Sequence, residues 1–391
     1  MKNSLLLLVA MAGWISARTP AQTNFQSGHI HKLNDIKIYD DKAFHCAFPS
    51  VIRRPDGELI VGFRRAPDWR QMGEGSYTHL DAKSQLVCVR SRDGGNNWTT
   101  EPQLIYADPF GGSQDPCLLQ LGDGSILCSS YGWAGLKTNM LARLKQPVVS
   151  QNQFVFMGGY LLRSENGGAS WSAPIIPPAV KGEARFNLFG QLSPAFNRGA
   201  MVEGKNGLLY WAVVRHDSKE SNKTSTHLLI SRDRGKSWSY SCVIAEDEKI
   251  AFNETSLYQT PKGDLVAFMR TAGDDDHTCI ARSADGGKSF QKWEDAGFQG
   301  HPHHALCLPD KRVLLVYGYR HPPCGIRARL LDPECINIAT AEETILRDDG
   351  GGFDLGYPWS ILVEGNRVLV VYYFNVANGV RYIAGTFVSV E

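Results

Sequence analysis

The chain has 391 residues, of which 43% are hydrophobic and 21% are charged, and its formal net charge at pH 7 is +1. Such a composition is that of a globular protein with enough apolar residues for a large core. The small net charge and the lack of long runs of one charge sign argue against nucleic acid or an anionic membrane surface as a partner. The length leaves room for one large domain or for two or three small ones, so internal repeats have to decide between them.

The N-terminus places an apolar run, residues 5–15, between a lysine and a stretch of small residues. This order predicts a secretory signal peptide over residues 1–21, with Ala21 as the favoured cleavage position. We therefore expect residues 22–391 to be secreted or periplasmic. No later apolar run reaches the roughly 18 residues that cross a bilayer, so no membrane span is expected. The nine cysteines lack C-x-x-C spacing, and we interpret most of them as buried thiols rather than a disulfide framework or a metal site.

An eight-residue pattern, S-x-[D/N]-x-G-x-[N/S]-[W/F], occurs four times along the chain. Its Asp or Asn can accept backbone N–H bonds, its Gly allows a positive φ and its aromatic ring can pack below the turn, which together predict a hairpin turn. Each copy follows an alternating, strand-like segment. The copies are SRDGGNNW at 91–98, SENGGASW at 164–171, SRDRGKSW at 231–238 and SADGGKSF at 283–290.

A second pattern precedes each octet: an entry segment, a short apolar strand, a tight turn and another apolar strand. Two further copies lack the octet, so the chain holds six units. Six such units, each with enough strand for a four-stranded antiparallel blade, predict an all-β, six-bladed β-propeller as a single domain over residues 22–391. Two stacked β-sandwiches are the alternative, but the spacing of the octets favours the ring. The units begin at residues 48, 115, 199, 253, 303 and 357.

The four octets resemble the Asp-boxes of the sialidase superfamily, and the order of the six units covers essentially the whole chain after the leader. The resemblance implies a catalytic propeller, and we expect no cofactor or metal in it. Sialidases hold a sugar carboxylate with three arginines, use a tyrosine–glutamate pair as the nucleophile and use an aspartate as acid and base. A guanidinium fork binds a carboxylate through two parallel bonds, and a neutral tyrosine avoids repulsion by that carboxylate.

The resemblance assigns several residues to these roles. In the fourth unit, which reads NETSLYQTPKGDLVAFMR, Glu254 matches the carboxylate that activates the nucleophile, and Arg270 matches a carboxylate-binding arginine. In the sixth unit, Tyr357 resembles the nucleophilic tyrosine that opens the last blade of the family. In the fifth unit, Arg320 and Arg327 compete for the next arginine of the triad.

The acid/base of the family lies on a loop upstream of the first Asp-box. Here that loop is long and contains glycines, as expected of a lid. It offers Asp68, Glu74 and Asp81, of which Asp81 has the expected spacing to the next strand and is favoured. Asp354, next to the sixth unit, is a rival acid.

The first unit departs from the family pattern. Sialidases carry an arginine in a [F/Y]-R-I-P signature, whereas this chain has Ala47 in the corresponding stretch, so the first arginine of the triad is missing. Arg64 and Arg65, at the end of the next strand, are the candidate substitutes, and a different mode of holding the ligand is the alternative. Histidines at strand entries, among them His45 and His303, are candidates for sugar contacts or proton transfer. Their spacing and partners do not indicate zinc.

These assignments imply a monomeric, exported exo-glycoside hydrolase that releases terminal sialic acid or a related acidic sugar from glycans. A second hypothesis is a propeller rhamnosidase or uronate lyase, in which a histidine such as His45 or His303 transfers the proton. A third is a glycan-binding propeller without catalysis, for which the missing arginine is the best support.

Overall fold

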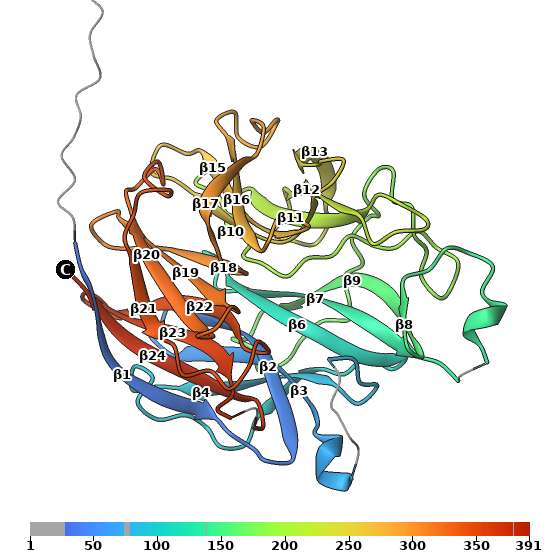
Figure 1. The fold of residues 1–391 in the computed structure, drawn as a ribbon, viewed down its shortest axis with the longest axis horizontal. Helices are drawn as coiled ribbons and strands as arrows, with labels where there is room; N and C mark the ends of the chain where they lie inside the picture. Colours follow the sequence, from blue (N-terminus) through green and yellow to red (C-terminus); the bar gives the residue numbers. More distant parts are fainter. Residues whose placement is uncertain (1–27, 74–78, 138, 378) are drawn as a thin grey trace, which may run out of the picture.

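The computed structural model describes residues 28–73, 79–137, 139–377 and 379–391. The signal peptide expected from the sequence and the loop acid Glu74 lie outside the described residues. The described chain forms six four-stranded antiparallel sheets, which confirms the all-β, six-bladed propeller (Figure 1). Its helical content is limited to two short 3₁₀ turns, Trp69–Met72 and Leu141–Arg143, and no described helix has the length and apolar character needed to cross a bilayer.

The first three blades are built from consecutive stretches of the chain. Blade one holds β2 (Phe44–Arg53), β3 (Leu59–Pro67), β4 (Gln85–Ser91) and β5 (Gln103–Tyr106). Blade two holds β6 (Gly111–Gln120), β7 (Ile126–Gly135), β9 (Phe154–Ser164) and β8 (Ser150–Gln151). Blade three holds β10 (Val202–Glu203), β11 (Leu209–His216), β12 (Thr224–Ser231) and β13 (Ser239–Ala245).

The last three blades continue in the same order from the centre outward. Blade four holds β14 (Ala251–Gln259), β15 (Leu265–Ala272), β16 (His277–Ser283) and β17 (Glu294–Gln299). Blade five holds β18 (His303–Cys307), β19 (Val313–Tyr319), β20 (Gly325–Leu331) and β21 (Glu343–Arg347). Blade six holds β22 (Gly356–Glu364), β23 (Arg367–Phe374), β24 (Tyr382–Val390) and β1 (Ile30–Tyr39).

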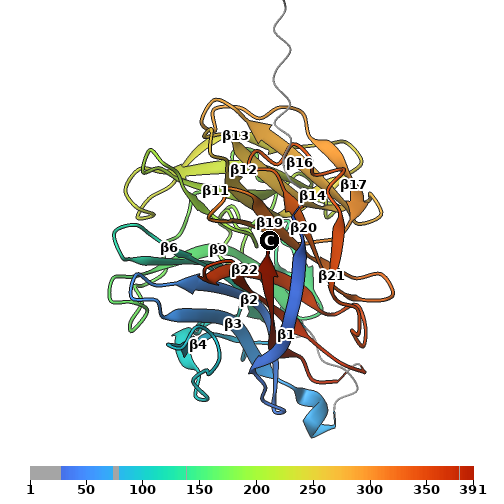
Figure 2. The ribbon, with the colours of Figure 1, turned by 90° about the vertical axis from the view of Figure 1, so that its left-hand side faces the viewer.

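The ring is closed by a strand from the start of the chain. β1 pairs antiparallel with β24, from Ile30 opposite Val390 to Tyr39 opposite Ile383, and Figure 2 shows β1 lying beside the C-terminal strand. At the centre, β22 of the last blade contacts β2 of the first blade. Because β1 and β24 come from opposite ends of the chain, their backbone bonds join the first and last parts of the ring.

The octets are hairpin turns, as their composition predicts. Asp93 accepts hydrogen bonds from the backbone N–H groups of Asn96 (3.1 Å) and Asn97 (2.9 Å) and from the Ser91 hydroxyl (2.9 Å). The Trp98 ring packs against the core cluster next to blades one and six. The other three octets repeat the serine-to-Asx and Asx-to-backbone bonds. These residues therefore serve folding, and none of them lines the cavity described below.

The cysteines are free thiols, and most are buried, as the sequence indicated. Seven of the nine are buried, while Cys242 is partly buried and Cys307 is exposed. Burial raises the pKa of Cys46, Cys117 and Cys128, so these thiols stay protonated and behave as small apolar side chains.

Four of the innermost strands share a distortion at their entries. The pairing register shifts between the first and second strands of blades one, two, four and six, which marks a β-bulge in each. One non-glycine residue at each bulge has a left-handed backbone, namely Phe48 (φ 57°), Asp115 (φ 40°), Glu254 (φ 36°) and Tyr357 (φ 53°). The bulge breaks the in-and-out alternation of side chains, and all four side chains line one central cavity.

Candidate active site

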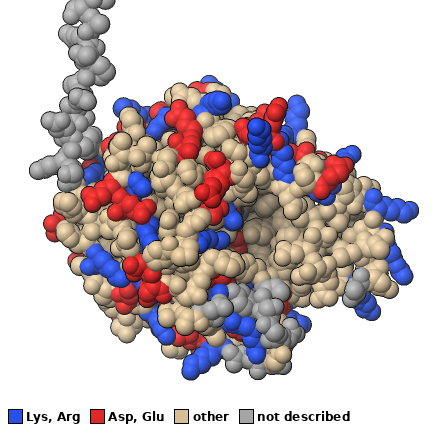
Figure 3. Space-filling model, viewed as in Figure 1, with Lys and Arg blue, Asp and Glu red and all other residues tan. Residues whose placement is uncertain are grey.

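A cavity of about 400 Å³ opens where the innermost strands of blades one, two, four and six converge. Figure 3 shows a hollow near the centre of the face, with acidic and basic atoms on one side of it and uncharged atoms on the other. The charged and hydrogen-bonding side chains that line the cavity include His79, Asp115, Glu254, Arg270, Arg320 and Tyr357. Its aromatic side chains are Phe48, Tyr131, Trp133, Phe156 and Phe196.

Three of the residues expected from the sequence form one hydrogen-bonded cluster in this cavity. The Tyr357 hydroxyl donates to Glu254 Oε1 at 2.5 Å, and Arg270 Nη1 lies 2.7 Å from Glu254 Oε2. The same Arg270 nitrogen donates to the Tyr357 hydroxyl oxygen at 3.3 Å. The structure thus brings together a phenol, a carboxylate positioned to take its proton and a guanidinium that holds both.

The electrostatics of the cluster keep the proton on the tyrosine and the charge on the glutamate. Burial works to raise the pKa of Glu254, but the Arg270 guanidinium and the hydrogen bond from Tyr357 outweigh it, and the pKa is lowered. Burial, helped by the negative charge of Glu254, raises the pKa of Tyr357 despite the nearby arginines. At neutral pH the pair therefore consists of a neutral phenol and an anionic carboxylate.

Arg320 is the second guanidinium that lines the cavity. Its Nε and Nη2 atoms each donate to the Leu355 carbonyl oxygen at 3.1 Å, and Nη2 also donates to the Tyr373 hydroxyl at 3.1 Å. The guanidinium carbon lies 5.0 Å from the centre of the Tyr357 ring. These bonds fix Arg320 beside the tyrosine and hold its charge at the cavity wall.

Arg327, the rival of Arg320, does not line the cavity. It is buried within blade five, where Nη2 donates to the Pro323 carbonyl at 3.1 Å and Nη1 donates to the Arg347 carbonyl. Its guanidinium lies over the Tyr319 ring at 4.7 Å. Of the two arginines that the sequence left open, the structure therefore places only Arg320 beside Tyr357.

In blade one, no arginine takes the place left by Ala47 in the cavity. Ala47 is fully buried, and the bulge brings Phe48 to the cavity wall instead. Arg64 is also fully buried, and its Nη1 lies 3.3 Å from His45 Nδ1, outside the cavity lining. Among the described residues, two guanidiniums therefore line the cavity, where a family-like site has three.

The histidines singled out in the sequence are buried beside the cavity rather than in it. Burial lowers the pKa of His45 to about 4 and that of His303 to about 3. His303, on blade five, has its Nε2 2.8 Å from the Thr278 hydroxyl of blade four, so its ring lies between the two blades. The histidines that do line the cavity are His79 and His216, which the sequence analysis did not select.

Asp81, the favoured acid, also lies outside the cavity lining. Its Oδ2 accepts the Trp69 indole N–H at 2.5 Å, and its Oδ1 accepts the Lys83 backbone N–H at 2.6 Å. Asp68 caps the short 3₁₀ turn and pairs with Arg70, with 2.6 Å between Oδ2 and Nη2. Both carboxylates are thus used in the structure of their own loop.

Asp115 is an acid in the cavity that the sequence analysis missed. It is buried, and its Oδ2 accepts the Tyr131 hydroxyl at 2.8 Å. Burial raises the pKa of Asp115 to about 6, against the attraction of Arg198 and with added repulsion from Glu254. The signal was present in the sequence, because Asp115 opens the second unit in the same way as Tyr357 opens the sixth.

Arg198 was likewise missed, one residue before the third unit. It is buried outside the cavity lining, and its Nη2 donates to the Pro49 carbonyl at 2.8 Å. Its guanidinium lies 5.3 Å from the Tyr357 ring centre and 5.0 Å from that of Trp359. Arg198 therefore packs against the tyrosine ring and adds positive charge beside it.

One group of side chains has the composition of a metal site. His45, His79 and Asp354 offer ligand atoms that all lie within 4.8 Å of one another. However, Arg381 Nε lies 2.8 Å from Asp354 Oδ2, and Arg64 contacts His45. Two adjacent guanidiniums repel a divalent cation. The group fits better as a support for His79, whose Nε2 is 2.8 Å from Asp354 Oδ1.

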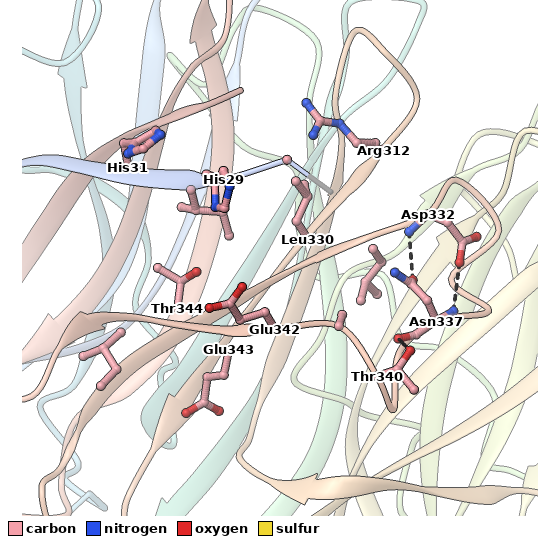
Figure 4. Close-up of a pocket in the computed structure, with 15 residues that line it drawn as sticks. His29, His31, Arg312, Leu330, Asp332, Asn337, Thr340, Glu342, Glu343 and Thr344 are labelled. Carbon is pink, nitrogen blue, oxygen red and sulfur yellow. Dashed lines mark hydrogen bonds between the residues drawn. The ribbon is translucent and has the colours of Figure 1, made fainter. Parts of the chain in front are cut away.

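A larger cavity, of about 640 Å³, lies at the outside of the ring (Figure 4). It is formed by outer strand β21, the loop before it and the first described residues of the chain. Asp332 and Asn337 bond to each other there at 2.8 and 2.9 Å, and Arg312 is paired with Asp310 at 2.6 Å. Its described lining does not combine a carboxylate, a phenol and a guanidinium, so we place the candidate active site in the central cavity.

Fold and site together define a six-bladed propeller with a tyrosine–glutamate–arginine cluster at its centre. The chain belongs to the family of BNR repeat-like domains, whose model matches residues 147–368. No curated protein matches it by sequence.

Solved structures share this fold over most of the chain. A protein of unknown function from Dyadobacter fermentans is 56% identical, with a TM-score of 0.91, over 93% of this chain and 99% of that one. A Hadza microbial sialidase is 15% identical, with a TM-score of 0.65, over 91% and 68%. The NanB sialidase of Streptococcus pneumoniae is 12% identical, with a TM-score of 0.62, over 92% and 70%. These sialidases therefore share the propeller fold of this chain.

Proposed function

We propose that this protein is a secreted or periplasmic, monomeric exo-glycoside hydrolase that releases a terminal acidic sugar, sialic acid or a close relative, from glycans. The observation that carries the proposal is the cluster of Tyr357, Glu254 and Arg270 in one central cavity. Export is supported by the apolar N-terminal run of the sequence.

In the proposed reaction, Tyr357 is the nucleophile. Its hydroxyl attacks the anomeric carbon while Glu254, 2.5 Å away, takes the phenolic proton. A neutral tyrosine can approach a carbon that bears a carboxylate, whereas an anionic nucleophile would be repelled. The proposed product of this step is a covalent glycosyl-tyrosine, which water then hydrolyses with retention. A sialidase from Trypanosoma rangeli with 2,3-difluorosialic acid as a covalent intermediate has this fold, at 13% identity and a TM-score of 0.62, over 91% of this chain and 59% of that one.

The proposed role of Arg270 and Arg320 is to bind the sugar carboxylate. Both line the cavity, and both lie against Tyr357, at its hydroxyl and over its ring. A guanidinium–carboxylate bond inside a partly desolvated cavity is worth about 1.5–3 kcal/mol. Two such contacts would orient the anomeric carbon toward the phenol.

Purified protein incubated with a fluorogenic sialoside, a fluorogenic uronoside and sialylated mucin glycans tests the proposal. We expect release of an acidic sugar by the native protein and none by Tyr357→Phe. Release of a neutral sugar alone, or of no sugar, refutes the assignment of an acidic substrate.

A second candidate function is proton transfer by a histidine, as in a propeller rhamnosidase or uronate lyase. The observation in its favour is His79, which lines the cavity and is oriented by the buried Asp354. A lyase would give an unsaturated product that absorbs in the ultraviolet, and a hydrolase would not. Glycan binding without turnover, unchanged by Glu254→Gln, would instead indicate a non-catalytic glycan-binding propeller.

A further inference from the structure

The proposed cleavage needs a group that gives a proton to the departing sugar oxygen. Asp81, which the sequence favoured, lies outside the cavity lining, and its carboxylate accepts hydrogen bonds from Trp69 and Lys83. We propose that Asp115 is this proton donor and that, in the second step, it is the base that activates water. This inference rests on the proposed hydrolase function.

The position of Asp115 places it among the reacting groups. It occupies the left-handed bulge position of blade two, as Glu254 does in blade four and Tyr357 in blade six, and it lines the same cavity. The residue is 2% exposed. Oδ2 accepts the Tyr131 hydroxyl, and Oδ1 is a buried oxygen without a hydrogen-bond partner in the described part of the chain. A buried polar atom of this kind at a cavity wall is a place where a ligand hydroxyl or ether oxygen can bind.

The surroundings of Asp115 let it keep its proton well above the usual range of an aspartate, up to about pH 6. Burial raises its pKa to about 6, and the negative charge of Glu254 adds to this effect. Glu254 has the opposite shift, because Arg270 and Tyr357 lower its pKa. When two carboxyl groups in one cavity have pKa values shifted in opposite directions, the one with the raised pKa usually acts as the acid and the other as the base. The charged and titratable groups that face Asp115 are Arg198, Glu254, Tyr131, His79, Arg64 and Tyr357.

The two steps balance with water as the only co-substrate. In the first step the Tyr357 oxygen bonds to the anomeric carbon, its proton passes to Glu254, the glycosidic C–O bond breaks and the Asp115 proton goes to the leaving oxygen. In the second step Asp115 takes a proton from water, whose oxygen attacks the anomeric carbon. The tyrosine–carbon bond then breaks, and Glu254 returns the proton to Tyr357.

The leaving group distinguishes a proton donor from a residue that only binds substrate. Asp115→Asn should lower kcat/KM by about 10²- to 10⁴-fold on a natural glycan, whose leaving group is a hydroxyl of the next sugar. On an activated aryl glycoside, whose phenol leaves without a proton, the loss should be less than about tenfold. Asp81→Asn is the matched control, and its kcat/KM should stay at the native value on both substrates.

The pH profile provides a second readout through Tyr131. The hydrogen bond from Tyr131 lowers the pKa of Asp115. Tyr131→Phe should therefore raise that pKa and move the alkaline limb of kcat/KM, near pH 6 in the native protein, upward by roughly 0.5–1 pH unit. Asp115→Asn should remove this limb.

Three outcomes of these experiments are decisive. A loss of kcat/KM in Asp115→Asn that is confined to the natural glycan, together with a shifted alkaline limb in Tyr131→Phe, supports Asp115 as the proton donor. Equal loss on both substrates, or a limb that does not move in Tyr131→Phe, overturns the assignment while the native hydrolase activity stands. Absence of acidic-sugar release by the native protein refutes the proposed function and this inference with it.

Discussion

Replacing Glu254 with glutamine removes the base from the Tyr357 pair while keeping the shape of the side chain. In the native cavity Glu254 Oε1 accepts the phenol at 2.5 Å and Oε2 lies 2.7 Å from Arg270. The glutamine amide can still accept one of these hydrogen bonds through its oxygen, but it cannot take a proton from Tyr357 at neutral pH. The cavity should therefore keep its form and lose the first proton transfer.

The expected loss of activity follows from that role. A positioned general base contributes about 10²–10⁴-fold in rate, or about 3–5 kcal/mol of the activation free energy. The stability loss should be smaller, about 2 kcal/mol, because the variant gives up a charged hydrogen bond to Arg270 but keeps a neutral one. The Arg270 side chain is 26% exposed, so water also solvates the charge that the variant leaves behind.

Glu58→Gln is a matched control for the stability term. Glu58 is 4% exposed and pairs with Arg54, Arg90 and Arg92 at 2.7–3.1 Å, away from the cavity lining. We expect both variants to lower the free energy of unfolding in urea, and only Glu254→Gln to lower kcat on the fluorogenic acidic glycoside. A kcat for Glu254→Gln within about threefold of the native value would refute the role of Glu254 as the base.

Three further predictions concern other parts of the propeller. Arg320→Met should lower kcat/KM for acidic sugars by about 10- to 100-fold, because it removes a charged hydrogen bond to substrate of about 1.5–3 kcal/mol. Arg327→Met, outside the cavity lining, should lower Tm and leave kcat/KM unchanged. Equal losses of kcat/KM in the two variants would contradict this placement. Asp93→Ala should lower Tm without changing kcat/KM, because its carboxylate bonds only within its own hairpin turn; a loss of activity at constant Tm would contradict it. Asp354→Asn should cost about 3–5 kcal/mol of unfolding free energy, because it removes the buried negative charge 2.8 Å from the Arg381 guanidinium, and a urea titration with an unchanged midpoint would disprove this.

The blades could be predicted from the sequence because their signal is local. Each octet, such as the one containing Asp93, needs only eight consecutive residues to form its turn, and its recurrence fixes the phase of the blade. The closing strand β1 was not predicted, because its partner lies at the other end of the chain. No spacing rule reports the pairing of Ile30 with Val390.

Candidate site residues could be brought together from the sequence where the blade phase determines the direction of a side chain. Glu254 and Tyr357 lie 103 residues apart, yet each occupies the entry of an innermost strand, so the ring brings them together. The same phase separates Arg320 from Arg327. Arg320 directly follows the second strand of its blade and Arg270 lies near the end of the second strand of blade four, whereas Arg327 lies on the third strand. The blade repeat does not determine where a loop side chain points. The loop acid Asp81 was therefore favoured from its spacing alone, and Asp115 at a strand entry was missed.

The four left-handed bulge residues show how the fold and the chemistry are related. A non-glycine residue in this conformation costs about 1–3 kcal/mol, so four of them at equivalent positions require a compensating structure. Phe48 adopts the same conformation without a reactive group, so the bulge belongs to the strand entry and not to the reaction. The closed ring of blades holds these entries in place, and the residue at each entry then decides what the cavity can do. In this chain the entries supply a phenol, a base and a buried acid, and in blade one an apolar ring at the position next to the missing arginine.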